Sequence, residues 1–160
     1  MTAVIFLKEP FKTLWENKDP FAEAGRIDAA AKAGDVFRHK EGRRTLRFSD
    51  GSASYFLKHH SGVGWKEIFK NLLQLRLPVL SAKNEYEAAI TLSAAGIDTL
   101  TPLAYGCRGH NPAAQESFLV TADILDTASL EDVCKNWSND PPPYAVKCAL
   151  IKKVAAMAKA

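Results

Sequence analysis

The stretch that most constrains the fold is residues 35–60, "DVFRHKEGRRTLRFSDGSASYFLKHH". Its runs of β-forming residues are interrupted at Glu41-Gly42 and again at Ser49-Asp50-Gly51. Asp-Gly between two alternating runs is a strong signal for a β-hairpin, because both residues tolerate the left-handed backbone of a tight turn. The sequence therefore predicts three antiparallel strands, over roughly residues 35–40, 43–48 and 53–59.

The segments after these strands alternate between helical and strand patterns. Apolar residues at helical spacing predict a helix within residues 64–78, where Pro78 limits its extent. A second helix is expected over residues 81–96, with Ser81 as its N-cap and Gly96 as its C-terminal stop. Two further strands are expected within "TPLAYGCRG" and "SFLVTADI", on either side of a turn-like segment.

Both ends of the chain have helical patterns. Residues 14–34 form an Ala-rich helical stretch that we expect to end at Gly34. Ser129 followed by Asp132 predicts a helix start, and the residues from Tyr144 onward predict a last helix. This order of strands and helices fits the α+β class, as a five-stranded antiparallel sheet with helices packed on it.

Composition limits the classes of protein and the cellular compartments that this sequence fits. A net charge of +3 is too small to indicate a nucleic-acid-binding protein. The three cysteines have no C-x-x-C spacing, which argues against a disulfide framework or a zinc site and suits a reducing compartment. The opening "MTAVIFLKEPF" is interrupted too early for a signal peptide, and no run approaches the ~20 apolar residues of a membrane span. We therefore expect a cytoplasmic protein.

Lys58 occupies an unusual position. Strand side chains alternate, so Lys58 should share a face with Phe56, while Leu57 and His59 lie on the other. A lysine on a buried face costs several kcal/mol unless it is paired. Either its ammonium reaches water from the strand end, or it holds phosphates and is oriented by a carboxylate from a neighbouring helix, as in protein-kinase-like sites.

Two glutamates of the second helix could supply that carboxylate. Glu85 and Glu87 are two residues apart and so point in directions about 200° apart. Glu85 shares its side of the helix with Ala88, Ala89 and Leu92. The periodicity favours Glu85 without deciding between them, and either residue could instead be an ordinary exposed helix charge.

Five cationic side chains gather in the first hairpin. They are Arg38, Lys40, Arg43, Arg44 and Arg47. Two interpretations stay open, a solvated strand edge and an anion-binding surface.

Several motifs of this chain resemble those of one family. They are "LKEPFKTLW", "DPF", "RRTLRF", "SYFLKHH", "FKNLLQLRLPVLSAKNEYEA", "SLED" and "ALIKKVA". Together they resemble the bacterial lipopolysaccharide core heptose (heptose I) kinases, protein-kinase-like enzymes that phosphorylate the first heptose of the inner core. The resemblance runs from about Phe6 to the end of the chain. It implies ATP as phosphate donor, magnesium as cofactor and inner-core heptose as acceptor.

The resemblance also assigns site residues. The family's ATP-anchoring lysine and glutamate match Lys58 in "YFLK" and Glu85 in "NEYEA". No G-x-G-x-x-G lies between the first two strands, where only Gly42 is present, so fewer backbone amides would cradle phosphate. Arg43 or Arg44 would compensate, unless both are exposed strand charges.

By the same resemblance, residues 1–34 are an N-terminal extension, 35–122 a kinase-like N-lobe, and 123–160 the hinge and the start of a truncated C-lobe. Adenine would lie against the backbone of Thr121, Ala122 and Asp123. No H-R-D or D-F-G motif occurs, so no catalytic residue is assigned and the magnesium ligands are expected outside this chain. We therefore expect the N-terminal portion of a kinase, inactive by itself, whose exposed apolar C-terminal face self-associates or binds a partner.

Two other site types find little support. Adjacent histidines on a strand point to opposite faces, so His59 and His60 do not easily share a metal ion with His39. A Ser-His-Asp hydrolase would need a G-x-S-x-G elbow, and the sequence has none.

A non-catalytic binding module is the main alternative. The basic hairpin and the helix within residues 64–78 would dock an acidic partner or a membrane surface, unless that helix simply packs on the lobe. Its apolar residues are Trp65, Ile68, Phe69, Leu72 and Leu73. Acyl carrier protein, which is acidic and is associated with the resembled family, is one such partner. Membrane docking would make this a peripheral protein on the inner face of the inner membrane.

Overall fold

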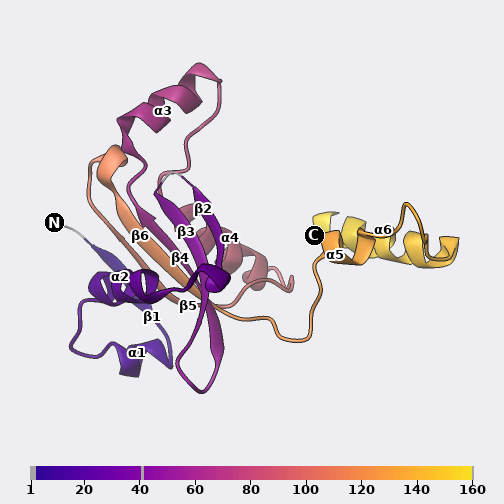
Figure 1. Ribbon diagram of the computed structural model, residues 1–160, viewed down its shortest axis with the longest axis horizontal. Helices are drawn as coiled ribbons and strands as arrows, with labels where there is room; N and C mark the ends of the chain where they lie inside the picture. Colours follow the sequence, from indigo (N-terminus) through magenta and orange to yellow (C-terminus); the bar gives the residue numbers. More distant parts are fainter. Residues whose placement is uncertain (1–2, 41, 160) are drawn as a thin grey trace.

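The computed structural model describes residues 3–40 and 42–159, so the Glu41 part of the first expected turn lies outside the described residues. Across these ranges one antiparallel sheet runs in the order β1-β5-β6-β4-β3-β2. Its strands are β1 Val4–Leu7, β2 Val36–Lys40, β3 Arg43–Ser49, β4 Ser54–Ser61, β5 Pro102–Arg108 and β6 Glu116–Ala122. Figure 1 shows the sheet at the centre of the molecule.

The three consecutive strands predicted in residues 35–60 are confirmed. Asp50 makes the second turn, because its Oδ1 accepts hydrogen bonds from the amides of Ser52 and Ala53, each at 2.9 Å. These bonds, led by the one from Ala53, hold the pKa of the Asp50 carboxyl well below its usual range. The left-handed φ of +95° at Gly51 completes the turn.

The expected strand count of five was wrong, because the described chain has a sixth strand at the sheet edge. β1 pairs antiparallel with β5, from Val4 opposite Cys107 to Leu7 opposite Ala104. Four apolar residues carry no alternation that would mark a strand, and their pairing partner lies about a hundred residues further along the chain. Only that distant partner makes the segment a strand.

Helices flank the sheet. They are α1 Phe11–Leu14, α2 Pro20–Ala30, α3 Gly64–Leu73, α4 Lys83–Ala94, α5 Leu130–Cys134 and α6 Tyr144–Lys159, with short 3-10 turns η1 Ala33–Asp35 and η2 Pro112–Ala114. Within the described ranges, no helix is both long and apolar enough to span a bilayer.

The helical stretch expected over residues 14–34 is in fact divided. Asn17 has a left-handed φ of +58°, and Asp19 caps α2 by accepting a hydrogen bond from the Phe21 amide at 3.0 Å. Pro20 follows as the first helical residue, where its missing N–H costs nothing. α2 then ends at Ala30 rather than at Gly34.

The predicted N-cap of α4 was also wrong. The residue before the helix is Ala82, without a side-chain cap, and its amide donates to the Ser117 hydroxyl at 3.0 Å. The cap predicted for α5 is confirmed, since the Ser129 hydroxyl accepts from the Asp132 amide at 3.0 Å.

The two faces of the sheet are packed differently. α1 and α2 cover one face and bury the main core. That core consists of Phe11, Trp15, Phe21, Ala24, Leu46, Tyr55, Leu57, Ala104, Phe118 and Val120. Phe11, Trp15 and Phe118 meet edge-on with ring centroids 5.0–5.6 Å apart, a favourable aromatic geometry.

α4 packs on the opposite face through a smaller contact. Tyr86 of α4 stacks on Tyr105 of β5 with ring centroids 4.3 Å apart, and Phe6 of β1 lies 5.4 Å from Tyr86. This contact fixes α4 against β5 and β1. After β6 the chain leaves the sheet, and α5 and α6 lie to one side of it (Figure 1).

Candidate functional site

The ammonium of Lys58 forms an ion pair with the carboxylate of Glu85, from β4 to α4. The Lys58 side chain is 23% exposed and that of Glu85 is 38% exposed, so the pair is partly open to solvent. The expected alternation holds, because Tyr55, Leu57 and His59 are buried on the opposite face. Lys58 is therefore paired, and it does not simply extend into water.

Glu87, the other candidate carboxylate, points elsewhere. It lies 3.6 Å from Lys83, one turn earlier on the same helix, and both side chains are more than half exposed. Such an exposed pair contributes little. The helical rotation between the two glutamates thus directs Glu85 to Lys58 of the sheet and Glu87 to solvent.

A row of side chains crosses the sheet beside Lys58. Lys58 pairs with Thr45 of β3, and Thr45 pairs with Arg38 of β2. Residues opposite each other in antiparallel strands point to the same face, and neighbouring strands lie about 4.8 Å apart. The Cα atoms of Arg38 and Lys58 are therefore about 10 Å apart on one face. Lys40 pairs with Arg43 on the same face, nearer the hairpin tip.

Arg44 cannot contribute to this face. Its guanidinium pairs with Asp28 of α2 at 2.9 Å and donates to the Asp28 carbonyl at 3.2 Å, on the opposite side of the sheet. Asp28 also bonds the Nδ1 of His59 at 3.0 Å. The expectation that Arg44 could compensate for the missing glycines was wrong, because β3 alternation directs its side chain to the α2 face.

Gly42 lies at the turn between β2 and β3. Its φ is +73°, and its carbonyl accepts a hydrogen bond from the Ser61 amide at 2.9 Å. A β-carbon on Gly42 would come within 2.2 Å of the Gly62 carbonyl oxygen. Turn geometry and close packing thus explain this glycine independently of any bound phosphate.

A pocket of about 520 Å³ lies where the chain leaves β6. Phe56, two residues before Lys58 and on its face, lines this pocket together with Phe37, and their ring centroids are 5.3 Å apart. Arg47 closes one side through an ion pair with Asp123 at 2.6 Å. The residues from Ala122 to Thr127 form the remaining wall, with Leu100 and Ser129.

The three residues expected to meet adenine lie beside this pocket. Thr121 is buried opposite Phe56, and Ala122 and Asp123 line the wall. The Ala122 amide donates to the Thr101 carbonyl at 3.0 Å, and the Asp123 amide donates to the Ser54 carbonyl at 3.1 Å. Those two amides are therefore occupied. Within the described ranges the next amide, that of Ile124, has no protein acceptor.

His60 is the buried ionisable group closest to this basic surface. Burial lowers its pKa to about 4, and the neighbouring charges of Arg43, His59 and Lys58 act in the same direction. His60 stays neutral at physiological pH, so it adds no charge to the Lys58 face.

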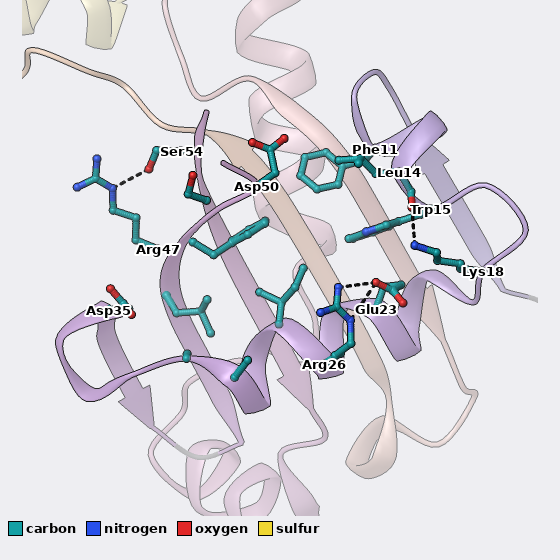
Figure 2. Close-up of a pocket in the computed structure, with 16 residues that line it drawn as sticks. Phe11, Leu14, Trp15, Lys18, Glu23, Arg26, Asp35, Arg47, Asp50 and Ser54 are labelled. Carbon is teal, nitrogen blue, oxygen red and sulfur yellow. Dashed lines mark hydrogen bonds and ion pairs between the residues drawn. The ribbon is translucent and has the colours of Figure 1, made fainter. Parts of the chain in front are cut away.

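A second groove, of about 720 Å³, lies on the α1–α2 face (Figure 2). Trp15 and Phe11 form its apolar wall. Its rim cations are already engaged, since Lys18 donates to the Leu14 carbonyl at 2.9 Å and Arg26 pairs with Glu23 at 2.8 Å. Arg47 also lines the groove and is paired with Asp123. The sheet separates this groove from Lys58.

The described residues contain no group of three His, Cys, Asp or Glu side chains able to hold a metal ion. The pairing of His59 with Asp28 is structural, because it ties α2 to the sheet.

An antiparallel sheet, a helix fixed against one face, and a strand lysine paired with a helix glutamate define the N-terminal lobe of a protein-kinase-like fold. Residues 28–160 match the "Lipopolysaccharide kinase (Kdo/WaaP) family". The chain belongs to this family.

Individual relatives support the assignment. The chain is 49% identical over 156 residues to an Escherichia coli protein described as "Lipopolysaccharide core heptose(I) kinase WaaP", covering 98% of this chain and 57% of the relative. It is 46% identical over 153 residues to a Pseudomonas aeruginosa protein of the same description, covering 55% of that relative. The chain thus spans somewhat more than half the length of these relatives.

A solved structure described as "WaaP in complex with acyl carrier protein" shares the fold. The TM-score is 0.74 at 38% sequence identity, over 96% of this chain and 54% of the other. Together with the sheet and its helices, this similarity confirms the kinase-like α+β fold.

Sequence reasoning missed three features of the site. Arg38 was grouped with the other cations, although only its pairing with Thr45 places it in the Lys58 row. Phe37 and the Ile124 amide were not singled out either. Strand alternation from Lys58 did place Phe56 on this face, but a backbone amide has no sequence signal.

Proposed function

We propose that this chain is the ATP-binding part of a lipopolysaccharide core heptose kinase. The observation that carries the proposal is the Lys58–Glu85 ion pair, which joins the central strand to α4. In kinase-like sites a lysine so oriented binds the α- and β-phosphates of ATP. Glu85 would act as a positioning residue that holds the ammonium where the phosphates bind.

The pocket beside β6 fits the base of the nucleotide. Phe56 and Phe37 offer an apolar surface for a purine ring. With the amides of Ala122 and Asp123 occupied, the amide of Ile124 is the donor for the edge of the base. The carbonyls of Ala122 and Asp123 are the acceptors.

The basic face of the first hairpin fits the phosphates. Arg38, Lys40 and Arg43 share the face of Lys58 and extend toward the hairpin tip. They would neutralise phosphate charge where a glycine-rich loop would offer backbone amides. In this arrangement the base lies at the β6 end of the sheet and the terminal phosphate near the hairpin tip.

Other parts of the proposal rest on the relatives. Inner-core heptose as acceptor follows from their description, and acyl carrier protein as a partner follows from the solved complex. The magnesium ligands and the catalytic aspartates would lie in the part of the relatives that this chain does not match. We therefore propose that the chain binds nucleotide but does not phosphorylate heptose by itself.

Nucleotide titration tests the proposal. A fluorescent ATP analogue should bind the wild-type chain, and Lys58→Met should weaken binding about tenfold or more, because one phosphate-contacting charge is lost. Lys83→Met is the matched control, since Lys83 lies on the solvated side of α4 with Glu87. Equal losses in both variants, or no binding by the wild type, would contradict the proposal.

A further inference from the structure

The segment from α3 to Val79 exposes an unusual amount of apolar surface. Of the apolar side chains of α3, only Ile68 is buried, where the helix contacts η2. The exposed ones in this segment are Trp65, Phe69, Leu72, Leu73, Leu75, Leu77 and Val79. We call these residues the α3 ridge. In Figure 1 the helix projects from the end of the sheet opposite the exit toward α5.

The ridge is continuous along the helix and beyond it. Trp65, Phe69 and Leu72 follow one helical stripe, with the rings of Trp65 and Phe69 5.9 Å apart. Leu73, Leu75 and Leu77 are 86%, 96% and 90% exposed. Soluble proteins rarely expose contiguous apolar surface of this kind unless it binds something.

Leu75 supports a binding role. It adopts a left-handed φ of +54° at the end of α3, a position at which glycine or asparagine is usual. The Leu75 amide donates to the Leu72 carbonyl at 3.0 Å, which closes the helix. A leucine here is conformationally unfavourable and contributes nothing to the core.

Cations border the ridge. Lys66 and Arg76 are exposed next to its apolar residues, and Lys70 pairs with Glu67 at 2.5 Å. The basic hairpin is close by, because the Ser61 amide at the end of β4 donates to the Gly42 carbonyl, and α3 begins at Gly64. An apolar ridge with Trp and Phe, bordered by Lys and Arg, is typical of helices that lie on anionic lipid surfaces.

We propose that the α3 ridge docks this protein on an anionic membrane surface. The ridge projects as a convex feature, so its apolar side chains can enter the lipid boundary while the cations meet lipid phosphates. The relatives act on lipopolysaccharide, a glycolipid that is anchored in a membrane. The ridge lies next to the hairpin tip, where the proposed function places the terminal phosphate. Docking would therefore bring the transferable phosphate toward the lipid surface.

Vesicle binding by the full chain tests this proposal. Co-sedimentation with phosphatidylglycerol-containing vesicles should exceed that with pure phosphatidylcholine vesicles. Phe69→Glu combined with Leu73→Glu should weaken binding to the anionic vesicles about tenfold or more, because both side chains leave the lipid boundary. Lys66→Glu combined with Arg76→Glu should remove the preference for anionic lipid. Leu130→Glu combined with Val133→Glu is the matched control on exposed residues of α5, and it should bind like wild type.

A second measurement needs no destabilising substitution. Brominated lipids should quench the tryptophan fluorescence of the wild type, and Trp65→Phe should lose most of that quenching. Trp15 is buried in the core, and Trp137 is half-buried between α5 and α6, outside the ridge. Absence of vesicle binding, or equal loss in the α5 control, would overturn the proposal. If vesicle binding survives the ridge substitutions while binding of acyl carrier protein is lost, the ridge binds a protein partner. That result would also overturn the membrane proposal. ATP affinity is measured in parallel and should be unchanged in the ridge variants, so that failure here is distinguishable from failure of the nucleotide proposal.

Discussion

The backbones of Gly42 and Gly62 approach so closely that a β-carbon on Gly42 would lie 2.2 Å from the Gly62 carbonyl oxygen. This contact joins the β2–β3 turn to the end of β4, so the only glycine of the expected phosphate-binding turn also has a packing role. Replacing it should affect folding whether or not nucleotide binds.

Gly42→Ala should lower the free energy of unfolding by about 2 kcal/mol or more, through left-handed strain and the clash with Gly62. Gly34→Ala is the control, because no described atom lies within 4 Å of the position that its new β-carbon would occupy, and its φ is not left-handed. Urea unfolding of both variants measures the difference. An unchanged midpoint for Gly42→Ala would show that the turn rearranges freely.

Lys58 and Glu85 should behave as one unit in ATP binding. Lys58→Ala and Glu85→Ala should each weaken ATP affinity, and the double variant should be scarcely worse than Lys58→Ala, because Glu85 acts only by holding the lysine. Glu87→Ala should bind ATP like wild type. Calorimetric titration of the four proteins completes the cycle. Additive losses would separate the two residues, and a loss confined to Glu87→Ala would show that Glu87 is the partner carboxylate.

Arg38 should contribute to binding of the phosphates of a nucleotide and not to binding of its base. Arg38→Ala should weaken binding of ATP and ADP several-fold more than binding of adenosine, because the guanidinium lies in the Lys58 row and away from the base pocket. Arg44→Ala, on the opposite face of the sheet, should leave all three affinities unchanged and instead lower stability through loss of the Asp28 pair. Equal effects of Arg38→Ala on ATP and adenosine would refute the assignment.

His60 should make stability depend on pH. Its pKa is lowered from 6.5 to about 4 in the folded chain, chiefly by burial. Between these two values the unfolded chain binds more protons than the folded one, so stability falls as pH decreases from 6.5 toward 4 and is constant above that window. A shift of this size corresponds to at most about 3 kcal/mol. His60→Gln should flatten this part of the pH–stability curve, as measured by urea unfolding. A slope unchanged from wild type would assign the effect to other groups.

The chain should self-associate through α6 when no partner is present. Ile151, Val154 and Met157 are 66%, 42% and 47% exposed on this helix. Ile151→Lys should shift the molar mass measured by light scattering toward the monomer, because a charge in an apolar contact is unfavourable. A monomeric wild type at high concentration would contradict this expectation.

Local chemistry made much of the fold predictable from the sequence. The Asp50-Gly51 turn and the alternation around Lys58 identified three strands, since turn geometry and side-chain period depend only on neighbouring residues. The α3 and α4 helices followed from periodicity for the same reason. Helical periodicity also showed that Glu85 and Glu87 point in different directions, although it did not determine which of them faces Lys58.

Tertiary structure alone decided the remaining features. β1 is a strand only because β5 lies beside it, and Ala82 starts α4 because Ser117 accepts its amide. Sheet register placed Arg38 in the row of Lys58 and directed Arg44 to Asp28. These contacts join residues far apart in sequence, so no local pattern encodes them. The sequence by itself determined which residues could serve at the site, and the pairing of distant strands decided which of them share a face.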